Sequence, residues 1–404
     1  MVRKIKTLVV IDNLYTGGVA TSLYNYLYFA HELMDIHLLV FDKDSIDKTK
    51  VPDNVEIVTP DKGLHILGKN HSRIKQESFL MMLYRLIMIF LARNINGVVS
   101  RMILWPFVKR QSGYDLAIAY AQDDSYKSIS KGCIDYIIKR VVAKHKSVIV
   151  HCDYKNFGGY DLRQINMFKK LNSIICVSDS CKRNFIECFP ELRNKTIVCE
   201  NFTNVDAIRK LAAESVSYPT ETVNFVSVCR LSEVKGLYRT IEALGELRDN
   251  GIVNFTWTIV GEGPEYKKLK SIIKEKQLTS KITLVGNKEN PYPYIKNASY
   301  FLLPSLHEAA PMVYGEAASL GVPVLSTETC SAIELVQERG IGVVVPNDYD
   351  GLLQGLRKLI MNPNSIHIKN NLDLNKFAMI QLKNFIESIK NRKCIKKYLQ
   401  YYMA

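Results

Sequence analysis

The chain has 404 residues, of which 47% are hydrophobic, and its formal net charge is +14. This length exceeds one ordinary core, so we expect two α/β domains of about 200 residues each. The nine cysteines are odd in number and no pair has metal-ligand spacing, which argues against a disulfide scaffold and a cysteine-held metal. The positive charge suits nucleic acid, an acidic membrane or a phosphorylated small molecule, and no recognised nucleic-acid-binding module accompanies it.

The first half of the chain alternates predicted strands and helices. Its opening residues, 1–6, lead into a strand rather than a signal-peptide core, so we infer no export and a reducing cytosol. Apolar runs predict strands at 7–11, 37–41, 55–59, 115–120, 147–151, 173–177 and 196–199. Helical periodicity predicts helices at 19–31, 126–144, 162–170 and 179–188, and two long helical stretches between 73 and 110.

Residues 79–110 combine long apolar runs with recurring basic residues. The first apolar run is interrupted by Arg85 and is shorter than the ~20 apolar residues that a comfortable membrane-spanning helix needs. The pattern is that of a basic amphipathic hairpin lying on an anionic bilayer. Two core helices with solvated basic edges are the alternative interpretation. The recurring basic residues are Arg85, Arg93, Arg101, Lys109 and Arg110.

The pattern loosens into a polar and helical connection at 201–219, where we place the domain boundary. The second half predicts strands at 223–229, 254–260, 282–285, 299–303, 322–325 and 342–345, with helices between them. We therefore expect one Rossmann-like domain at 1–203 and a second at 204–370. A lysine-rich helical segment at 371–404 would pack back on the first domain.

Strands that alternate with helices imply parallel sheets with right-handed crossovers. Ligands of such sheets bind at the carboxyl ends of the strands. Two domains of this kind that face one another predict one cleft between them. The loops expected to line it are 12–18, 151–157, 229–236, 261–264, 286–292 and 304–311.

Two loops of the first domain carry candidate ligand-binding residues. Gly17 and Gly18 open a helix after the first strand, where glycine permits a phosphate to approach the helix N-terminus. They do not match the fingerprint G-x-G-x-x-G, which argues against a nicotinamide enzyme. His151 and Asp153 stand where another strand ends and could bind a sugar hydroxyl or accept a proton. Ordinary turn residues are the alternative in both loops.

Two loops of the second domain suit a nucleotide diphosphate. Arg230 and Lys235 bracket a strand-to-helix connection, with Lys235 expected just inside the helix. Two cations beside helix-terminal N–H groups can neutralise a diphosphate leaving group without a metal. Gly261 and Gly263 form a tight strand-to-helix loop whose backbone can line a nucleotide pocket, with a plain turn as the alternative.

Glu308 and Glu316 are the most informative pair in the sequence. Glu308 lies on a predicted strand-to-helix loop, and Glu316 lies in the short helix that follows Pro311. Two carboxylates and free backbone N–H groups around one crevice suit a ligand with many hydroxyls and a phosphate.

In their order and spacing, these segments resemble a retaining glycosyltransferase of family 4, of the bacterial surface-polysaccharide type. The resemblance implies the GT-B fold, which is α/β with two Rossmann-like parallel-sheet domains facing an interdomain cleft. The domain at 1–203 would bind the acceptor, and the domain at 204–370 would bind the nucleotide sugar. It covers most of the chain and is densest from 223 to 345. The segments that carry it are Gly17-Gly18, His151, Arg230 to Gly236, 260–264, Gly286 with 290–294, and Glu308 to Glu316 with 321–324.

The resemblance implies a role for each matching residue. Glu316 would bind the ribose hydroxyls of a nucleotide sugar, and Glu308 would reach the transferred sugar. Arg230 and Lys235 would hold the diphosphate. His151 would contact the donor sugar near the reacting carbon. The catalytic candidates are His151, Arg230, Lys235 and Glu308, and the substrate-binding candidates are Gly17, Gly18, Asp153, Gly261, Gly263, Asn290, Pro291, Ala309, Ala310, Met312, Val313 and Glu316.

One segment departs from the family pattern. Family members commonly carry glycine and a bulky apolar residue after the first glutamate, where this chain has Ala309 and Ala310. His307 stands where an aromatic residue is frequent. The departure bears on donor identity and keeps two alternatives open. One is a nucleotide-sugar 2-epimerase on the same scaffold, and the other is a non-catalytic partner subunit that has kept the fold.

We therefore predict a cytoplasmic enzyme, peripheral on the inner face of the cell membrane. It would transfer a hexose or N-acetylhexosamine from a nucleotide diphosphate sugar, with UDP-sugars favoured, to a glycan or lipid-linked acceptor. The reaction would retain the anomeric configuration and need neither metal nor cofactor. The enzyme would contact an anionic membrane surface through 79–110 and bind no nucleic acid.

Overall fold

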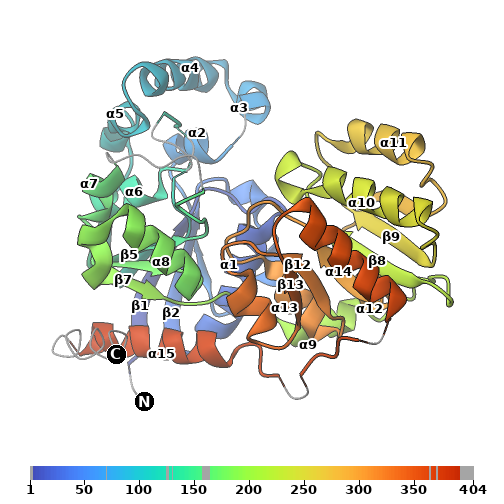
Figure 1. Cartoon of the computed structure of the whole chain (residues 1–404). Helices are drawn as coiled ribbons and strands as arrows, with labels where there is room; N and C mark the ends of the chain where they lie inside the picture. The colour runs from blue at the N-terminus through green and yellow to red at the C-terminus, as the bar shows by residue number, and fades with distance from the viewer. Residues whose placement is uncertain are drawn as a thin grey trace. The chain divides into compact units, whose positions relative to one another are not determined.

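The computed structural model describes residues 3–69, 71–123, 127–129, 131–156, 164–363, 365–369 and 372–391 of the chain. The chain divides into two compact units, one of Met1–Phe202 with Asn375–Ala404 and one of Thr203–Leu374. Each unit has its own parallel sheet and its own helices, as Figure 1 shows.

Within the described residues, the first unit holds a seven-stranded parallel sheet in the order β3-β2-β1-β4-β5-β6-β7. The strands are β1 (Ile5–Ile11), β2 (Met34–Val40), β3 (Glu56–Val58), β4 (Gln111–Ala119), β5 (Val141–Val150), β6 (Ser173–Cys176) and β7 (Thr196–Val198). The helices are α1 (Gly18–Ala30), α2 (His65–Gly68), α3 (His71–Glu77), α4 (Phe79–Asn94), α5 (Gly97–Met102), α6 (Cys133–Arg140), α7 (Ile165–Phe168), α8 (Asp179–Cys188) and α15 (Lys376–Lys390). Short 3-10 turns occupy Lys43–Ser45, Lys48–Lys50, Lys62–Leu64, Trp105–Phe107 and Pro190–Lys195.

The last described helix, α15, packs on the first unit although it follows the second unit in sequence. Its Gln381 side chain accepts a hydrogen bond from the backbone N–H of Glu200 at 2.9 Å. Its Phe385 ring lies edge-on to His145 of β5, with the ring centroids 5.9 Å apart. The apolar side of α15 is therefore buried against residues of this unit.

The helix predicted at 126–144 is too long at both ends, because α6 begins only at Cys133 and the described residues of 127–132 are not helical. The helix α6 ends at Arg140, and 141–144 already belong to β5. Val141 and Val142 are β-branched, and such residues favour strands over helices. Of the helix predicted at 162–170, only Ile165–Phe168 forms an α-helix, α7, and the described residues 169–170 form a turn. Tyr126 and Leu162, the first residues of the two predicted helices, lie outside the described residues.

The helical region predicted at 73–110 consists of three shorter helices, α3, α4 and α5, rather than two long ones. Ser78 caps α4, since its hydroxyl accepts a hydrogen bond from Met81 N–H at 3.3 Å. Asn96 caps α5 in the same way and accepts from Val99 N–H at 2.7 Å. Ser and Asn side chains that satisfy backbone N–H groups start new helices at such positions.

Arg85 and Arg101, both expected on a membrane-facing hairpin, are buried. Arg85 is 8% exposed and donates to the carbonyl oxygen of Ile66. Arg101 is 1% exposed and lies 2.8 Å from Asp123 and 2.6 Å from Asp135. A buried guanidinium needs such partners, because its desolvation would otherwise be costly. The expectation that these two residues face a bilayer is therefore wrong.

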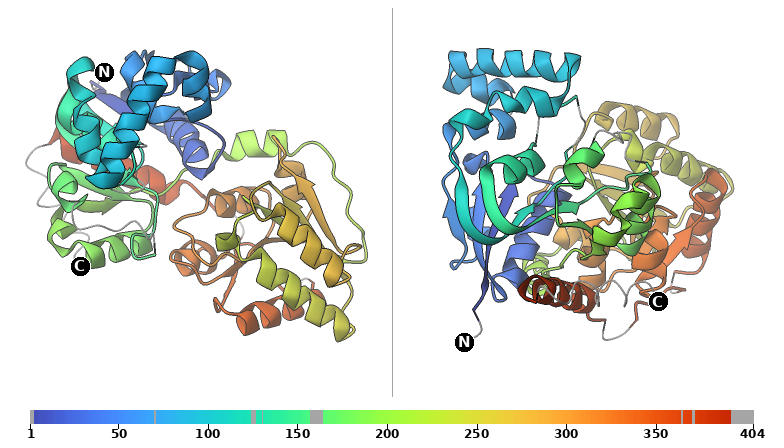
Figure 2. Two further views of the ribbon diagram at one scale, coloured as in Figure 1. Left: turned by 90° about the horizontal axis from the view of Figure 1, so that it is seen from above. Right: turned by 90° about the vertical axis from the view of Figure 1, so that its left-hand side faces the viewer.

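Helix α4 presents an exposed apolar row on its outer side. The residues of this row are between 43% and 75% exposed. Arg85, Met88 and Ala92 form the buried side of the same helix. Figures 1 and 2 show α4 at the periphery of the first unit, away from the sheet. The apolar row consists of Phe79, Leu80, Leu83, Leu86, Ile87 and Phe90.

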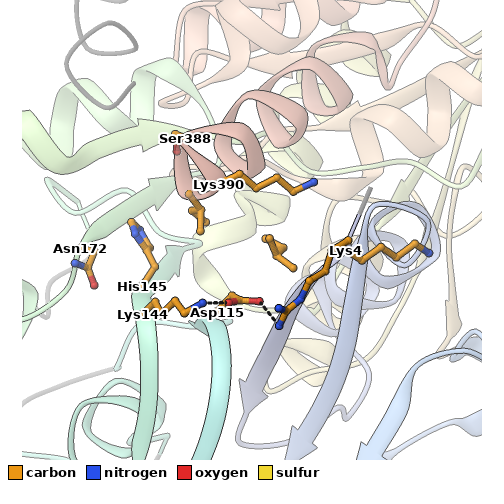
Figure 3. Close-up of a pocket in the computed structure, with 10 residues that line it drawn as sticks. Lys4, Asp115, Lys144, His145, Asn172, Ser388 and Lys390 are labelled. Carbon is orange, nitrogen blue, oxygen red and sulfur yellow. Dashed lines mark hydrogen bonds and ion pairs between the residues drawn. The ribbon is translucent and has the colours of Figure 1, made fainter. Parts of the chain in front are cut away.

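A basic hollow of about 750 Å³ lies where the strands of the first sheet begin, beside the end of α15. Figure 3 shows Lys144 of β5 directed at Asp115 of β4, and their charged atoms are 2.7 Å apart. Lys4 donates to the carbonyl oxygen of His31, at the end of α1, at 2.9 Å. Helix ends with free carbonyls attract cations. Two basic side chains of this hollow, Lys4 and Lys144, thus have partners in the fold itself.

Within the described residues, the second unit holds a six-stranded parallel sheet in the order β10-β9-β8-β11-β12-β13. The strands are β8 (Val223–Val228), β9 (Phe255–Val260), β10 (Ile282–Gly286), β11 (Tyr300–Leu303), β12 (Val324–Thr327) and β13 (Gly342–Val345). The helices are α9 (Val205–Leu211), α10 (Leu237–Asp249), α11 (Tyr266–Glu275), α12 (Tyr292–Lys296), α13 (Met312–Ser319) and α14 (Tyr349–Met361), with a π-helical turn at Ile333–Gln337.

The core of the second unit is built on both faces of this sheet. Trp257 of β9 is fully buried, and its indole N–H donates to Ser227 Oγ of β8 at 3.0 Å. Ser227 in turn donates to the carbonyl oxygen of Leu302 in β11 at 2.6 Å. A buried indole N–H is satisfied in this way. The chain of contacts ties three neighbouring strands together beneath the loops that carry the site.

Candidate functional site

In the second sheet, the strand order reverses between β8 and β11. Ligands of open parallel sheets bind beyond the carboxyl ends of the strands at such a reversal. The loop after β8 carries Arg230 and Lys235, and the loop after β11 carries Glu308. The fold therefore brings these three predicted residues to one edge of the sheet.

Lys235 lies outside α10, which corrects the prediction that it lies just inside this helix. It ends the 3-10 turn Glu233–Lys235, and Gly236 in the left-handed region (φ 63°) separates this turn from α10. The Lys235 ammonium lies 2.6 Å from Glu308 Oε1. The two side chains are 22% and 13% exposed. This shielding from water strengthens their attraction relative to a surface pair.

Ser305 donates its hydroxyl to the same oxygen, Glu308 Oε1, at 2.7 Å. Ser305 follows β11 and is fully buried. Among the described residues, no hydrogen-bond donor contacts Glu308 Oε2. Two protein donors thus hold one carboxylate oxygen, and the second oxygen remains available to a ligand.

A second layer of contacts holds the backbone that precedes Glu308. Arg239 of α10 donates to the carbonyl oxygen of Pro304 at 2.8 Å and to the side-chain oxygen of Asn347 at 2.6 Å. The Asn347 amide donates to the carbonyl oxygen of Leu306 at 2.9 Å. Arg239 and Asn347 therefore clamp the segment 304–306 from two sides.

Two glycines allow these loops to pack backbone against backbone. A Cβ atom at Gly236 would overlap the carbonyl oxygen of Pro304. A Cβ atom at Gly261, whose φ is 139°, would overlap the carbonyl oxygen of Cys229. Gly263 lies equally close to Leu231. The close approach explains the glycines without reference to a ligand.

Arg230 is exposed, and no described residue forms an ion pair or side-chain hydrogen bond with its guanidinium. Its free charge contrasts with that of Lys235, which is paired. The loop position is set by the backbone, since Leu231 N–H next to it donates to the carbonyl oxygen of Glu262 at 2.9 Å. Arg230 is thus held at the edge of the sheet with its side chain free to meet an anion.

The helix α13 begins without a side-chain cap on its first turn, as far as the described residues go. Ala309 and Ala310 are half-buried on the loop before it, and the Ala309 carbonyl oxygen accepts from the Ser331 hydroxyl. Met312 opens the helix and is 9% exposed, and Val313 is half-buried. An uncapped helix start offers backbone N–H groups to a phosphate.

Glu316 lies on α13 and is 7% exposed. Burial raises the pKa of its carboxyl to about 7. The pKa of Tyr292, the first residue of α12, is raised by burial and by the charge of Glu316, which places the two side chains near one another. No described residue donates a hydrogen bond to the Glu316 carboxylate. A nearly buried carboxylate without a protein donor is suited to hydroxyl donors from a ligand.

Asn290 and Pro291 begin α12 and have contacts within the unit. The Asn290 amide donates to the carbonyl oxygen of Leu211, at the end of α9, at 2.8 Å. Its side-chain oxygen accepts from Tyr292 N–H at 3.3 Å. Pro291 is the N-cap of α12. These contacts assign Asn290 and Pro291 a part in placing Tyr292.

In the first sheet, the order reverses between β1 and β4, so the loop with Gly17 and Gly18 also lies at a reversal. Gly17 is extended (φ 162°) and Gly18 opens α1. Among the described residues, a Cβ atom at Gly18 would meet nothing within 4 Å, and one at Gly17 would meet only Tyr15 O at 4.0 Å. The protein's own packing leaves space at both glycines.

His151 follows β5 and is half-buried. Its ring lies 5.2 Å from the ring of Tyr120. Burial and the nearby charge of Lys131 lower the pKa of His151 to about 3, so the imidazole is neutral at pH 7. Its Nε2 atom is buried and has no hydrogen-bond partner among the described residues. Such an orphaned atom is expected to meet a ligand or a water molecule.

Asp153 is engaged in its own loop. Its carboxylate accepts from Lys155 N–H at 3.2 Å, from the Asn156 amide at 2.8 Å and from the Asn184 amide at 2.7 Å. It is 7% exposed. Of the two interpretations open at the sequence level, this geometry is that of a turn aspartate, which anchors the loop after His151 to α8.

Sequence reasoning did not identify Ser305, Arg239 and Tyr292 as parts of the site. Ser305 precedes Glu308 by three residues, which is a spacing at which Ser side chains often bond within a loop. Arg239 follows Lys235 by four residues, but Gly236 interrupts the helix between them. Tyr292 belongs to a segment that sequence reasoning did single out, but only through its neighbours Asn290 and Pro291.

The described residues contain no group of three or more His, Cys, Asp or Glu side chains arranged to hold a metal ion. None of the helices in the described ranges has the length and hydropathy needed to cross a membrane.

Residues 209–376 match the family described as "Glycosyl transferases group 1". The glycosyltransferase MJ1059 of Methanocaldococcus jannaschii is 29% identical over 167 residues, which cover 40% of this chain and 41% of that protein. WcaL of Escherichia coli K12, named as a colanic acid biosynthesis glycosyltransferase, is 33% identical over 156 residues, covering 36% and 38%. The chain thus matches about two fifths of the length of these curated relatives.

The fold likeness extends over the whole chain. The crystal structure of HepE from Anabaena, in complex with UDP-glucose, has a TM-score of 0.59 and 16% identity and covers 99% of both chains. The expected α/β architecture of two Rossmann-like parallel-sheet units, the GT-B fold, is confirmed. The resemblance to glycosyltransferases is likewise confirmed, at the level of this broader family.

Proposed function

Since residues 209–376 match glycosyl transferases group 1, we propose that this chain is a retaining glycosyltransferase of polysaccharide biosynthesis. Its donor would be a nucleotide diphosphate sugar, with a UDP-sugar favoured, and it would transfer a hexose or an N-acetylhexosamine. The acceptor would be a glycan or a lipid-linked glycan. The name of WcaL and the UDP-glucose bound by HepE support this proposal.

The observation that carries the proposal is the cluster at the reversal of the second sheet. Lys235 and Glu308 are paired at 2.6 Å, and Arg230 is exposed at the start of the same loop as Lys235. The uncapped start of α13 adds backbone donors. Positive charge, helix-terminal N–H groups and a carboxylate match the diphosphate and the hydroxyls of a donor sugar.

Transfer would break the bond between the anomeric carbon and the β-phosphate oxygen and form a bond from that carbon to an acceptor hydroxyl oxygen. In the mechanism that we favour, the departing phosphate oxygen accepts the acceptor's proton on the same face. Arg230 and Lys235 would stabilise the charge that develops on the diphosphate. We propose that these charges act without a metal ion, so turnover should persist in a chelator.

The buried carboxylate of Glu316 would bind the ribose of the nucleotide. Two vicinal hydroxyls can donate to the two oxygens of one ionised carboxylate. Tyr292 lies near the same carboxylate and would border the nucleotide. Glu308 Oε2, which accepts nothing from the described residues, would take a hydroxyl of the transferred sugar.

From the first unit, we propose that His151 takes part in the reaction as a neutral imidazole. Its orphaned Nε2 would hydrogen-bond a donor-sugar hydroxyl. The open space above Gly18 would admit phosphate to the start of α1. The same unit would bind the acceptor.

The apolar row of α4 would rest on an anionic membrane. Six apolar side chains on one helix face are exposed, and Arg93 of the same helix is exposed too, as are Lys109 and Arg110 later in the chain. Apolar burial at the interface and attraction of these cations to anionic lipid would act together. The protein would then work at the cytoplasmic face of the membrane, where a lipid-linked acceptor is held.

A screen of thermal stability with UDP, GDP and their sugars tests the proposal, because a ligand stabilises the folded state according to its affinity. We expect UDP and UDP-sugars to raise the Tm.

Incubation with UDP-N-acetylglucosamine alone should give slow hydrolysis, and release of UDP should accelerate when an acceptor is added. Conversion of the sugar to its 2-epimer would identify the epimerase alternative. Binding of UDP without turnover on any acceptor would favour the non-catalytic partner, which Ala309 and Ala310 keep open.

A further inference from the structure

Ser305 and Arg239 hold the Glu308 segment in place, although neither is expected to touch the diphosphate. We propose that Ser305 is a positioning residue that fixes the orientation of the Glu308 carboxylate, with Arg239 bracing the backbone from which both residues extend. This inference rests on the proposed function, in which Glu308 contacts the transferred sugar. It names the residues that hold Glu308 in position for that contact.

Two side chains donate hydrogen bonds to the same oxygen of the Glu308 carboxylate. Lys235 at 2.6 Å and Ser305 at 2.7 Å both donate to Oε1 of Glu308. One donor would leave the carboxylate free to rotate about its bond to the side chain. Two donors from different directions on one oxygen define the plane of the group and so the direction of Oε2.

Ser305 itself is held rigidly by contacts of the backbone around it. It is fully buried, and its carbonyl oxygen accepts from Thr327 Oγ1 at 2.6 Å. The preceding carbonyl oxygen, that of Pro304, accepts from Arg239 at 2.8 Å. Leu306 N–H donates to the carbonyl oxygen of Val234, on the Lys235 loop, at 2.7 Å. The serine hydroxyl is therefore presented from a backbone fixed on both sides.

The loops that carry Glu308 and Lys235 are linked to each other. The contact of Leu306 with Val234 joins the Glu308 loop to the Lys235 loop by main-chain atoms. Any movement of Ser305 would therefore change the orientation of the Glu308 carboxylate. It would also change the distance between this carboxylate and the Lys235 ammonium. Small displacements of this kind are costly in catalysis, since reacting groups must be held close to their productive geometry.

The test compares Ser305→Ala with Ser227→Ala. Ser227 is an equally buried serine of the same sheet whose hydroxyl bonds Leu302 and Trp257 instead of Glu308. For each variant, binding of UDP and of a UDP-sugar is measured by calorimetry, together with kcat and KM. We expect Ser305→Ala to bind UDP as the wild type does and to lower kcat about tenfold. In this variant, the affinity for the UDP-sugar should exceed the affinity for UDP by much less than it does in the wild type. Ser227→Ala should change only the Tm.

A double-mutant cycle separates positioning from general damage. In a Glu308→Ala background, Ser305→Ala should have no further effect on kcat, because its partner is already absent. Additive losses, or equal losses of UDP and UDP-sugar binding in Ser305→Ala, would overturn the inference while leaving the proposed function intact. Failure of the wild type to bind or turn over any nucleotide sugar would instead defeat the proposed function and, with it, this inference.

Discussion

The ammonium of Lys235 and the carboxylate of Glu308 meet at 2.6 Å although 73 residues separate them in the chain. The contact joins the loops after β8 and β11, the strands at which the second sheet reverses its order. In the absence of a ligand, each charge thus has a partner of opposite sign. A diphosphate that approached Lys235 would therefore meet a cation whose position is already set.

Lys235→Ala and Arg230→Ala should both impair turnover but differ in their effect on stability. Each variant loses one of the cations that stabilise the leaving diphosphate, so we expect kcat to fall at least tenfold, which corresponds to about 1.4 kcal/mol. Lys235→Ala also leaves Glu308 without its ion-pair partner and should lower the Tm. Arg230 has no such partner among the described residues, so Arg230→Ala should leave the Tm unchanged. Thermal unfolding and initial rates on the two variants decide this, and wild-type turnover in either one would remove that residue from the site.

Affinity for UDP should rise with pH near neutrality. The pKa of Glu316 is raised to about 7 by burial, and only the ionised carboxylate can accept from both ribose hydroxyls. Between pH 6 and pH 8 the ionised fraction rises about tenfold, and the affinity should follow. Calorimetric titrations across this range measure the effect. Glu316→Gln should bind UDP weakly and show little dependence on pH, and a wild-type affinity that is flat over this range would contradict the prediction.

The same carboxyl makes the stability of the unliganded protein depend on pH in the opposite direction. Its folded pKa of about 7 lies above the ordinary value of 4.5, so the folded state binds the proton more tightly than the unfolded state. The stabilisation is fully present below pH 4.5 and is lost as the pH rises through 7. Comparison of wild type with Glu316→Gln, by denaturant unfolding at several pH values, isolates this contribution.

Gly236→Ala should be strongly destabilising. The residue has φ 63°, and a Cβ atom there would overlap the carbonyl oxygen of Pro304. We expect a loss of at least about 2 kcal/mol, because overlap adds to the cost of the left-handed conformation. Gly251→Ala is the matched control, since Gly251 has φ 80° but no described residue within 4 Å of the added atom. It should cost only about 1 kcal/mol. Equal values from denaturant unfolding would show that the contact with Pro304 is unimportant.

Replacement of Phe79, Leu80 and Phe90 by serine should abolish binding to vesicles that contain anionic lipid. These side chains are 68%, 75% and 66% exposed on the outer face of α4. Serine removes the apolar area that would enter the lipid interface. Cosedimentation with phosphatidylglycerol vesicles measures the loss. A variant with Met361→Ser and Ile380→Ser, which removes exposed apolar residues elsewhere, should bind as the wild type does.

Several elements could be predicted from the sequence because their signal is local. The strand at Gly342–Val345 and the helix at Asp179–Cys188 have the predicted bounds, since apolar runs and a capping serine mark their ends. The transition from α6 to β5 was missed because no glycine or proline separates them. Periodicity alone could not reveal that a helix passes directly into a strand at Val141.

The predicted site residues fall into two groups for a physical reason. Residues recognised from a combination of motifs, such as Lys235 and Glu308, meet in the structure because both follow strands that flank one reversal. For the other predicted residues, burial and hydrogen bonding decide whether the side chain is available to a ligand. Neither can be read from the sequence. Asp153 and Arg101 carry charge in a suggestive pattern, yet each is buried among partners of its own unit.

The glycine-lined seam between the loops after β8 and β9 has one more implication. Gly261 meets Cys229, and Gly263 meets Leu231, through main-chain atoms alone. Side chains beside this seam can therefore change during evolution while the backbone of the two loops keeps its conformation. Laboratory evolution toward a new sugar would do well to vary Ala309 and Ala310 and to leave the seam untouched.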